Sequence, residues 1–472
     1  MQRGPQTVAE ASGWKATTPT AEVWSFLEQL PALSHGKRLT IHSCGQTLLG
    51  KKIALVKASL DGQGLGGESS RSGRLRVLIQ ANIHGGEVEG KEICLELLRE
   101  IALGGHEALL AAIDLWVLPD FNADGNDEIS RHNRVSQKGP EDGVGERANS
   151  QGLDLNRDYL KAESREVRAL LAVLRKFDPH LFLDLHTTNG SAHGYHLTYA
   201  PSLAVNQDAA IADYLHDRFL PKVRAGLEKE GVRTFDYGNF ARMPDGKEGW
   251  RSFGPEPRYA SNYAGIRGRL SVLSEAYSYL DFPGRAKATK AFVLACLQRA
   301  VKDADEIREL CRAADRKMTD PAVTLPRLGY DTDFCDPVVR EILVGKLETL
   351  RLEGLGTRRI MTDEMRAEKM PVQARFRARK FTDLPAGWAL RGASDEVRQR
   401  LLFHGIVVQK LVEAQEVTAG HFAIEEARRE ARAFQGHRLR TLKGGFASRK
   451  TDLPAGPLIV PAPQRPGPLP AR

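Results

Sequence analysis

The sequence lacks any long apolar run, and its first 20 residues contain no apolar core. No segment approaches the roughly 18 continuous apolar residues that a membrane span requires, so we expect no membrane partner. A secretory signal would need a short apolar stretch near the start, and the polar residues 1–20 do not supply one. As written, the sequence therefore predicts a cytoplasmic protein, with secretion or a periplasmic location as the alternative.

Cysteine is scarce and its spacing is uninformative. The five cysteines are scattered along the chain and odd in number, which favours reduced thiols over a disulfide framework. They do not form a C-x-x-C pair, which argues against a zinc site built from cysteine.

The formal net charge of +8 is unevenly distributed, because residues 425–450 carry much of the excess. A basic patch can bind nucleic acid. Here it lacks interleaved aromatic residues and any helix-turn-helix pattern, so we interpret it as a solvated surface and expect no nucleic-acid partner. The sequence leaves the oligomeric state open.

The 472 residues fall into two consecutive regions that differ in their pattern of predicted strands and helices. Between residues 74 and 310, apolar strands alternate with amphipathic helices, a pattern typical of an α/β domain with a mainly parallel sheet. After residue 318, short β-rich runs dominate, with one helix over 394–405. We predict a flexible lead (1–20), an α/β domain (21–318), a small β-rich accessory domain (319–460) and a Pro-rich tail (461–472).

A short repeat occurs in the β-rich region. The segment TDLPAG is present at residues 382–387 and again at 451–456, and each copy precedes an apolar run. We interpret the two copies as similar turns within one small β domain.

Polar residues follow four of the predicted strands, at the point where each strand ends. Residues 77–83 run into His84, residues 113–121 into Asn122, residues 181–185 into His186, and residues 270–274 into Glu275. In open α/β sheets, ligands bind outside the carboxyl ends of the strands. We therefore expect these groups to converge in one crevice.

Three of these residues have the chemistry of a zinc site. His84 and Glu87 form an H-x-x-E pair across a Gly-Gly step that permits a tight turn, and His186 would be the third ligand. Imidazole nitrogen and carboxylate oxygen both suit zinc, and a catalytic zinc keeps a fourth position open. The alternative is that the histidines are ordinary core or loop residues, but the accompanying motifs favour one zinc ion per chain.

Two further motifs fit around such a site. In the G-L-D-L-N-R segment, Asp154 could accept the free ring N–H of His84, as partners of zinc-bound histidines commonly do. Asn156 and Arg157 could clamp a carboxylate, because the arginine fork matches carboxylate geometry. Glu275 could take a proton from an attacking water. Each motif alone is as well explained by a surface loop or an exposed strand end.

The ordered set H-x-x-E, N-x-D-G, D-x-N-R, a lone His and a strand-ending Glu resembles the zinc carboxypeptidases of the M14 family, over roughly residues 22–315. The resemblance implies a central mixed, mostly parallel sheet flanked by helices, with one zinc and hydrolysis of a C-terminal peptide bond. It implies His84, Glu87 and His186 as zinc ligands, Glu275 as general base, Asp154 as the partner of a ligand, and Asn156 and Arg157 as the carboxylate clamp.

The resemblance leaves two positions undecided. An arginine after N-x-D-G should polarise the scissile carbonyl, and Arg131 and Arg134 are both in range, with Arg134 slightly favoured. A tyrosine that caps the substrate should precede the general base, and Tyr259 and Tyr263 are both candidates.

Two other functions remain open at this stage. The D-L-H-T-T-N segment at residues 184–189 is similar to bacterial members and to the aspartoacylase and succinylglutamate desuccinylase branch, so deacylation of N-acyl amino acids is the first alternative. A catalytically inactive binding protein of the same fold is the second. In the preferred interpretation the partner is a peptide or amino-acid-derived substrate with a free carboxylate.

Overall fold

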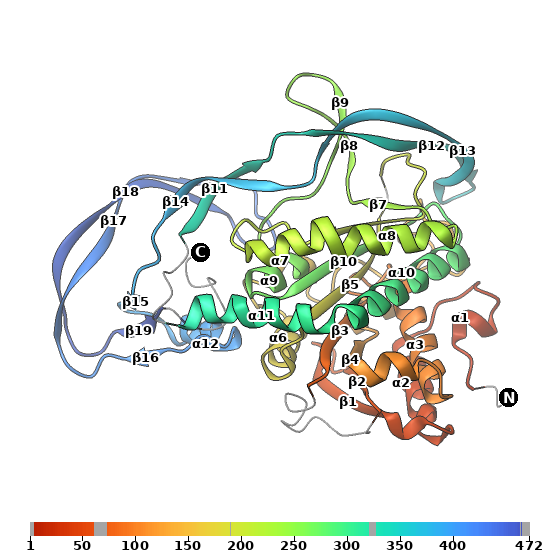
Figure 1. The fold of residues 1–472 in the computed structure, drawn as a ribbon, viewed down its shortest axis with the longest axis horizontal. Helices are drawn as coiled ribbons and strands as arrows, with labels where there is room; N and C mark the ends of the chain where they lie inside the picture. Colours follow the sequence, from red (N-terminus) through yellow and green to blue (C-terminus); the bar gives the residue numbers. More distant parts are fainter. Residues whose placement is uncertain (1–3, 61–72, 189, 321–326, 463, 465–472) are drawn as a thin grey trace.

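The computed structural model describes residues 4–60, 73–188, 190–320, 327–462 and 464. Its centre is an eight-stranded sheet with the order β1-β2-β4-β3-β5-β10-β6-β7 (Figure 1). The four central strands β4, β3, β5 and β10 run parallel to one another, whereas β1, β2 and β6 join the sheet by antiparallel pairing. The strands of this sheet are β1 (Leu39–Gln46), β2 (Lys52–Ala58), β3 (Leu75–Ala81), β4 (Ile113–Leu118), β5 (Leu181–Thr188), β6 (Leu197–Pro201), β7 (Thr234–Asp236) and β10 (Leu270–Tyr277).

Helices cover both faces of the sheet, because alternate side chains of the buried strands point to opposite sides. In β3, Val77 and Ile79 join the core on one face, and Leu78 joins the core on the other. The first face is covered by α2 (Thr20–Gln29), α3 (Glu89–Ala102), α7 (Ala209–Asp213), α8 (Leu220–Lys229), α10 (Phe282–Lys302) and α11 (Ala304–Thr319). The second face is covered mainly by α6 (Arg165–Phe177) and α9 (Ala260–Ile266).

The helical stretch that ends the sheet domain is divided into α10 and α11 at Asp303. The carboxylate of Asp303 accepts hydrogen bonds from Tyr214 and from Arg299, both at 2.6 Å. The two helices meet at this residue, whose backbone leaves helical geometry.

The described part of the N-terminal segment lies against the sheet domain. Helix α1 (Val8–Ala11) begins with a capping box between Thr7 and Glu10, and Glu10 also pairs with Arg99 of α3. Further along, the hydroxyl of Thr17 donates to buried Glu92 at 2.8 Å. Short connecting helices elsewhere in the domain are α4 (Glu107–Ala112) and α5 (Ala123–Asp127).

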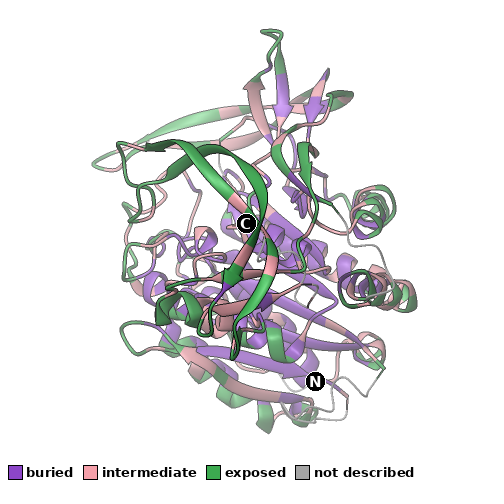
Figure 2. Ribbon diagram, turned by 90° about the vertical axis from the view of Figure 1, so that its left-hand side faces the viewer, coloured by how far each residue is buried: buried purple, intermediate pink, exposed green. Residues whose placement is uncertain are grey.

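The C-terminal region is β-rich, as predicted, and much of it extends beyond the helices (Figure 1). Two long antiparallel hairpins, β12–β13 and β17–β18, dominate it. In Figure 2 the exposed strands arch in front of the buried body. The elements are β11 (Leu328–Phe334), β12 (Val338–Leu352), β13 (Gly356–Gln373), β14 (Phe376–Thr382), β15 (Gly387–Leu390), α12 (Asp395–Phe403), β16 (Gln409–Lys410), β17 (Gln415–Arg429), β18 (Arg440–Leu453) and β19 (Leu458–Pro461).

The sheets of this region also involve the sheet domain. Strand β13 pairs with β9 (Glu248–Arg251), which pairs in turn with β8 (Asn239–Arg242). The strands that follow the two TDLPAG copies, β15 and β19, pair with each other, so the repeat marks two strands of one small sheet. Of the predicted Pro-rich tail, only residues 461, 462 and 464 are among those described. No helix in the described ranges has the length and hydropathy of a membrane span.

Candidate active site

Three neighbouring parallel strands bring the predicted residues to one edge of the sheet. His84 follows β3, His186 lies near the end of β5, and Glu275 lies near the end of β10. In the parallel pairing of β5 with β10, Glu275 stands opposite His186. Three of the four groups expected to converge therefore line one pocket, whereas Asn122 does not line it and instead donates to the carbonyl of Arg147.

The turn between His84 and Glu87 has no space for larger residues. The backbone N–H of Glu87 donates to the carbonyl of His84 at 2.9 Å. A Cβ on Gly85 would collide with the backbone of Gly125, and a Cβ on Gly86 would lie 2.6 Å from Arg134. The two glycines thus permit the close approach that places both side chains in the site.

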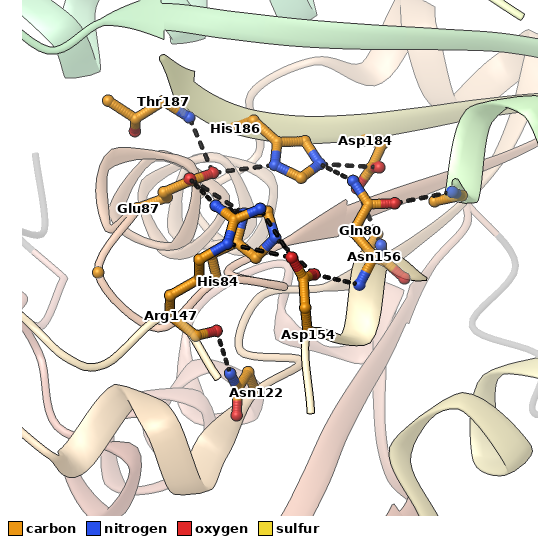
Figure 3. Close-up of polar contacts among 12 residues, drawn as sticks. Gln80, His84, Glu87, Asn122, Arg147, Asp154, Asn156, Asp184, His186 and Thr187 are labelled. Atoms are coloured by element: carbon orange, nitrogen blue, oxygen red, sulfur yellow. Dashed lines mark hydrogen bonds and ion pairs between the residues drawn. The ribbon is translucent and has the colours of Figure 1, made fainter. Parts of the chain in front are cut away.

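His84, Glu87 and His186 form a compact, buried cluster (Figure 3), with their potential ligand atoms all within 4.8 Å of one another. The Nδ1 atom of His84 lies 3.0 Å from one carboxylate oxygen of Glu87, and the Nδ1 atom of His186 lies 2.9 Å from the other. Two imidazole nitrogens and a carboxylate facing one point are the donor set of a catalytic zinc. The residues present therefore fit the ion.

Each histidine is oriented by a carboxylate on its far side (Figure 3). Asp154 accepts from Nε2 of His84 at 3.1 Å, as the sequence predicted, and Asp184 lies 2.9 Å from Nε2 of His186. Gln80 donates to the other oxygen of Asp184 at 2.8 Å and accepts from Tyr159 at 2.8 Å. Both rings thus present Nδ1 to the cluster.

The charges of the cluster stabilise one another. Burial opposes the ionised form of Glu87, but His84 and Arg134 hold the pKa of this carboxyl well below its usual range. Burial likewise opposes protonation of His186, yet Asp184 and Glu87 raise its pKa well above the usual range. For Asp154, the bond to His84 and the charge of Arg147 outweigh burial and lower its pKa. The cluster therefore consists of paired charges, in which each carboxylate lies beside a histidine or an arginine.

Glu275 stands apart from this ionised set. Burial, reinforced by the charge of Glu87 and opposed by His186 and the arginines, raises the pKa of Glu275 to about 8. A carboxyl group with a pKa in this range can both accept and return a proton near neutral pH.

Three arginines lie between the N-x-D-G and D-x-N-R motifs, and two of them line the pocket. Arg134 donates to Glu87 at 3.0 Å and to the carbonyl of Thr187 at 2.8 Å. Arg147, which the sequence did not suggest, donates twice to Asp154 and lies 3.3 Å from Nδ1 of His84. Arg131 pairs with Asp142 on the surface, where both side chains are about 60% exposed (62% and 61%), and does not line the pocket.

The two candidate tyrosines occupy different places. Tyr259 lines the pocket, and its ring lies under the guanidinium of Arg157 at 4.6 Å. Tyr263 is fully buried in the core, where its hydroxyl lies 2.8 Å from Nδ1 of His404, so it does not reach the site. The structure brings only Tyr259 to the pocket.

Asn156 and Arg157 both line the pocket. The side-chain oxygen of Asn156 accepts from the backbone N–H of Ala260 at 2.8 Å, and its NH₂ group lies 3.4 Å from Nε2 of His186. Arg157 donates to the carbonyl of Asn156 at 2.8 Å. Other residues that line this cavity of about 220 Å³ are Thr187, Thr188, Tyr237, Phe253, Ser261 and Leu273.

Amide hydrolysis by zinc needs three protein ligands, an open position and a nearby base. This chain supplies the three ligands and the half-buried carboxyl group of Glu275 at one sheet edge, an arrangement that defines the class of zinc hydrolases. The comparisons with known proteins narrow that class. The family model of the zinc carboxypeptidases, peptidase M14, matches residues 24–210, a range that includes all three ligands.

The chain is also similar to individual carboxypeptidases. Carboxypeptidase 2 of Trichophyton rubrum is 24% identical over 438 residues, 88% of this chain and 74% of that protein. Carboxypeptidase 2 of Trichophyton equinum is 26% identical over 267 residues, but this chain spans only 47% of it. Carboxypeptidase A from Helicoverpa armigera aligns with a TM-score of 0.45 and 16% identity, over 62% of this chain and 75% of that one. Residues 24–210 thus match the zinc carboxypeptidase family, and with its buried His84, Glu87 and His186 cluster the chain is a zinc metallocarboxypeptidase.

Asp184 offers a test of how the zinc site is held together. We predict that Asp184→Asn weakens zinc binding about 10- to 100-fold, because the substitution removes the charge that orients and polarises His186. The measurement is a competition titration with a chromogenic chelator. Asp142→Asn, which changes an exposed carboxylate outside the pocket, is the control. Equal zinc affinity in the two variants would contradict the role of Asp184.

Proposed function

We propose that this chain removes the C-terminal residue of peptides, with Glu275 as general base and Arg157 as the anchor of the terminal carboxylate. The observation that carries the proposal is the placement of Glu275, a half-buried carboxyl with a raised pKa, opposite the ligand His186 in one pocket. The match to the zinc carboxypeptidase family implies peptide substrates with a free C-terminal carboxylate.

Zinc would be held by Nδ1 of His84, Nδ1 of His186 and the carboxylate of Glu87. When bound, it supplies a Lewis acid that makes water more acidic and polarises a carbonyl. Glu275 takes the proton from the attacking water and returns it to the nitrogen of the departing amino acid. Burial supports the first step, because a carboxylate that is more easily protonated is a stronger base, and the protonated form can then return the proton.

Arg147 is the better placed arginine to polarise the scissile carbonyl. The guanidinium of Arg134 is already engaged by Glu87, Thr187 and Gln137, and only 15% of its side chain is exposed. The side chain of Arg147 is 42% exposed at the same pocket. We assign Arg147 to the carbonyl and Arg134 to the support of Glu87, in place of the slight preference for Arg134 from sequence.

Arg157 and Asn156 would bind the terminal carboxylate. The guanidinium fork offers paired donors to the two oxygens, and the NH₂ group of Asn156 adds a third donor. A terminal carboxylate held by Arg157 in the same pocket as the zinc ligands would confine cleavage to the last peptide bond.

The remaining walls suggest the nature of the departing residue. Beyond the charged residues, Asn156 and Tyr259, the pocket is lined by Tyr237, Phe253 and Leu273 together with the uncharged side chains of Thr187, Thr188 and Ser261. Burial raises the pKa of Tyr237 to about 12, so its ring is neutral. We propose that the enzyme prefers apolar or aromatic C-terminal residues.

Glu275→Gln tests the general base. We expect kcat/KM to fall by about 10²–10⁴-fold with zinc content unchanged, because the amide cannot accept the proton. In the unaltered enzyme, the acidic limb of the kcat/KM profile should lie above pH 5, since burial raises the pKa of Glu275 above its ordinary value to about 8. Activity should therefore rise with pH as Glu275 ionises. Full activity in a zinc-loaded Gln variant would contradict the assignment.

Arginine substitutions separate the two assigned roles. Arg147→Ala should lower kcat by about 10²-fold or more while zinc affinity is retained, because a preorganised donor to the developing oxyanion is lost. Arg134→Ala should instead weaken zinc binding, because Glu87 loses its partner. Steady-state kinetics and metal analysis of both variants make the comparison, and the reverse pattern would restore Arg134 to the carbonyl.

Peptides that differ only in the last residue test the specificity. Free acids ending in Leu or Phe should give kcat/KM at least about tenfold above those ending in Lys or Glu, because a charged side chain would be buried without a partner. N-acyl amino acids, the substrates of the deacylase alternative, belong in the same assay. Preference for Lys or Glu would overturn the specificity, and preference for N-acyl amino acids would overturn the peptidase assignment.

A further inference from the structure

The tip of the β17–β18 hairpin reaches the catalytic body beside the pocket. Phe434 and His437 exchange two backbone hydrogen bonds, at 2.7 and 3.1 Å, across Gln435 and Gly436. Both central residues have positive φ, 49° and 77°, the geometry of a tight two-residue hairpin turn. We refer to residues 434–437 as the tip turn.

The tip turn is attached to the segment that carries the carboxylate clamp. The side-chain oxygen of Gln435 accepts from the backbone N–H of Asp154 at 2.9 Å, and Nε2 of His437 lies 2.6 Å from Glu163. Lys161 donates to the carbonyl of Gln435 at 3.3 Å. Residues near the C-terminal end of the chain therefore contact the loop that holds Asp154 and Arg157.

A stack of alternating rings and guanidinium groups runs from the tip turn to the pocket. Arg258 lies 5.0 Å from the ring of Phe434 and 5.1 Å from the ring of Tyr259, so it has an aromatic ring on two sides. The ring of Tyr259 in turn lies 4.6 Å from the guanidinium of Arg157. Tyr259 and Arg157 line the pocket, whereas Arg258 and Phe434 do not.

We propose that Phe434 and Arg258 are positioning residues for the carboxylate-binding end of the pocket. Arg258 and Phe434 hold the ring of Tyr259 in place, and the ring holds the guanidinium of Arg157 toward the substrate. A long side chain that is already ordered loses less conformational entropy when it binds. The proposal rests on the proposed function, because it assumes that Arg157 binds the terminal carboxylate.

The role of Phe434 differs from a purely structural one in its kinetic signature. A positioning role acts on binding of the free carboxylate, so it changes KM and leaves kcat and zinc content nearly unchanged. The effect should also depend on the aromatic face, because a cation is attracted to the ring rather than to its volume. Loss of the hairpin fold would instead lower thermal stability for any truncation of similar size.

The experiment measures kcat, KM, zinc content and thermal stability of full-length Phe434→Ala and Arg258→Ala with a peptide that ends in a free leucine. We expect KM to rise roughly 3- to 10-fold in each, the change expected for loss of one partly exposed cation–π contact, with kcat within about twofold. Phe434→Tyr should restore KM, and Phe434→Leu should not.

Phe446→Ala is the matched control. Phe446 lies on β18 of the same hairpin, is 75% exposed, and contacts Phe422 instead of the catalytic body. Its substitution should leave KM unchanged. If Phe434→Leu equals the unaltered enzyme, or if Phe434→Ala and Arg258→Ala match Phe446→Ala, the proposal is overturned.

Arg157→Ala distinguishes failure of this inference from failure of the proposed function. An unchanged KM in Arg157→Ala would refute the carboxylate clamp itself. If Arg157→Ala raises KM, the double variant Phe434→Ala/Arg157→Ala tests whether Phe434 acts through Arg157. We expect no further rise in KM when Phe434 is truncated in the absence of Arg157, because coupled residues are not additive. Additive effects would show that Phe434 acts independently of Arg157 and would overturn the inference.

Discussion

The parallel pairing of β5 with β10 is the constraint on which the site depends. Glu275 stands opposite His186 because the two strands pair in this register, and a shift by one residue would turn Glu275 to the other face of the sheet. The same edge receives His84 from β3, which pairs with β5. Strand register therefore fixes the relative position of a ligand and the base before any side-chain contact is considered.

The second requirement is electrostatic. The site buries Glu87, Asp154 and Asp184 close together, with half-buried Glu275 beside them, an arrangement that would be costly without compensating charge. The histidines, Arg134 and Arg147 provide that charge, and hydrogen bonds satisfy the remaining oxygens of Asp184 and Glu87. Glu275 is the member with least compensation, and its raised pKa is the result. The ligand Glu87 and the base Glu275 carry the same chemical group. The difference between their pKa values therefore comes from the residues around them.

Much of the site could be predicted from the sequence because its motifs are local. His84 and Glu87 lie within one turn, and His186 and Glu275 follow recognisable buried strands. Asp184 could have been found by the same reasoning, since residues two apart on a strand point to the same side. Arg147 could not, because nothing in its neighbourhood distinguishes it from other basic loop residues. The choice between Tyr259 and Tyr263 also needed the structure. The two tyrosines are only four positions apart, at the N-cap and within one short helix, yet Tyr259 lines the pocket and Tyr263 lies in the core. The β-rich character of the C-terminal region was predicted, but the length and pairing of its two long hairpins were not, since pairing over such lengths leaves no local signal.

The order of the sheet has a consequence for how the enzyme folds. β3 pairs with β5, and β5 with β10, so neighbouring strands of the central sheet come from distant parts of the chain. Contacts of such high sequence separation require large loops to close before they stabilise anything, which slows folding. The base is carried by the last of these strands to be synthesised. A nascent chain that has made only the three zinc ligands therefore has a metal site and no general base, and catalytic competence arises late in the maturation of the protein.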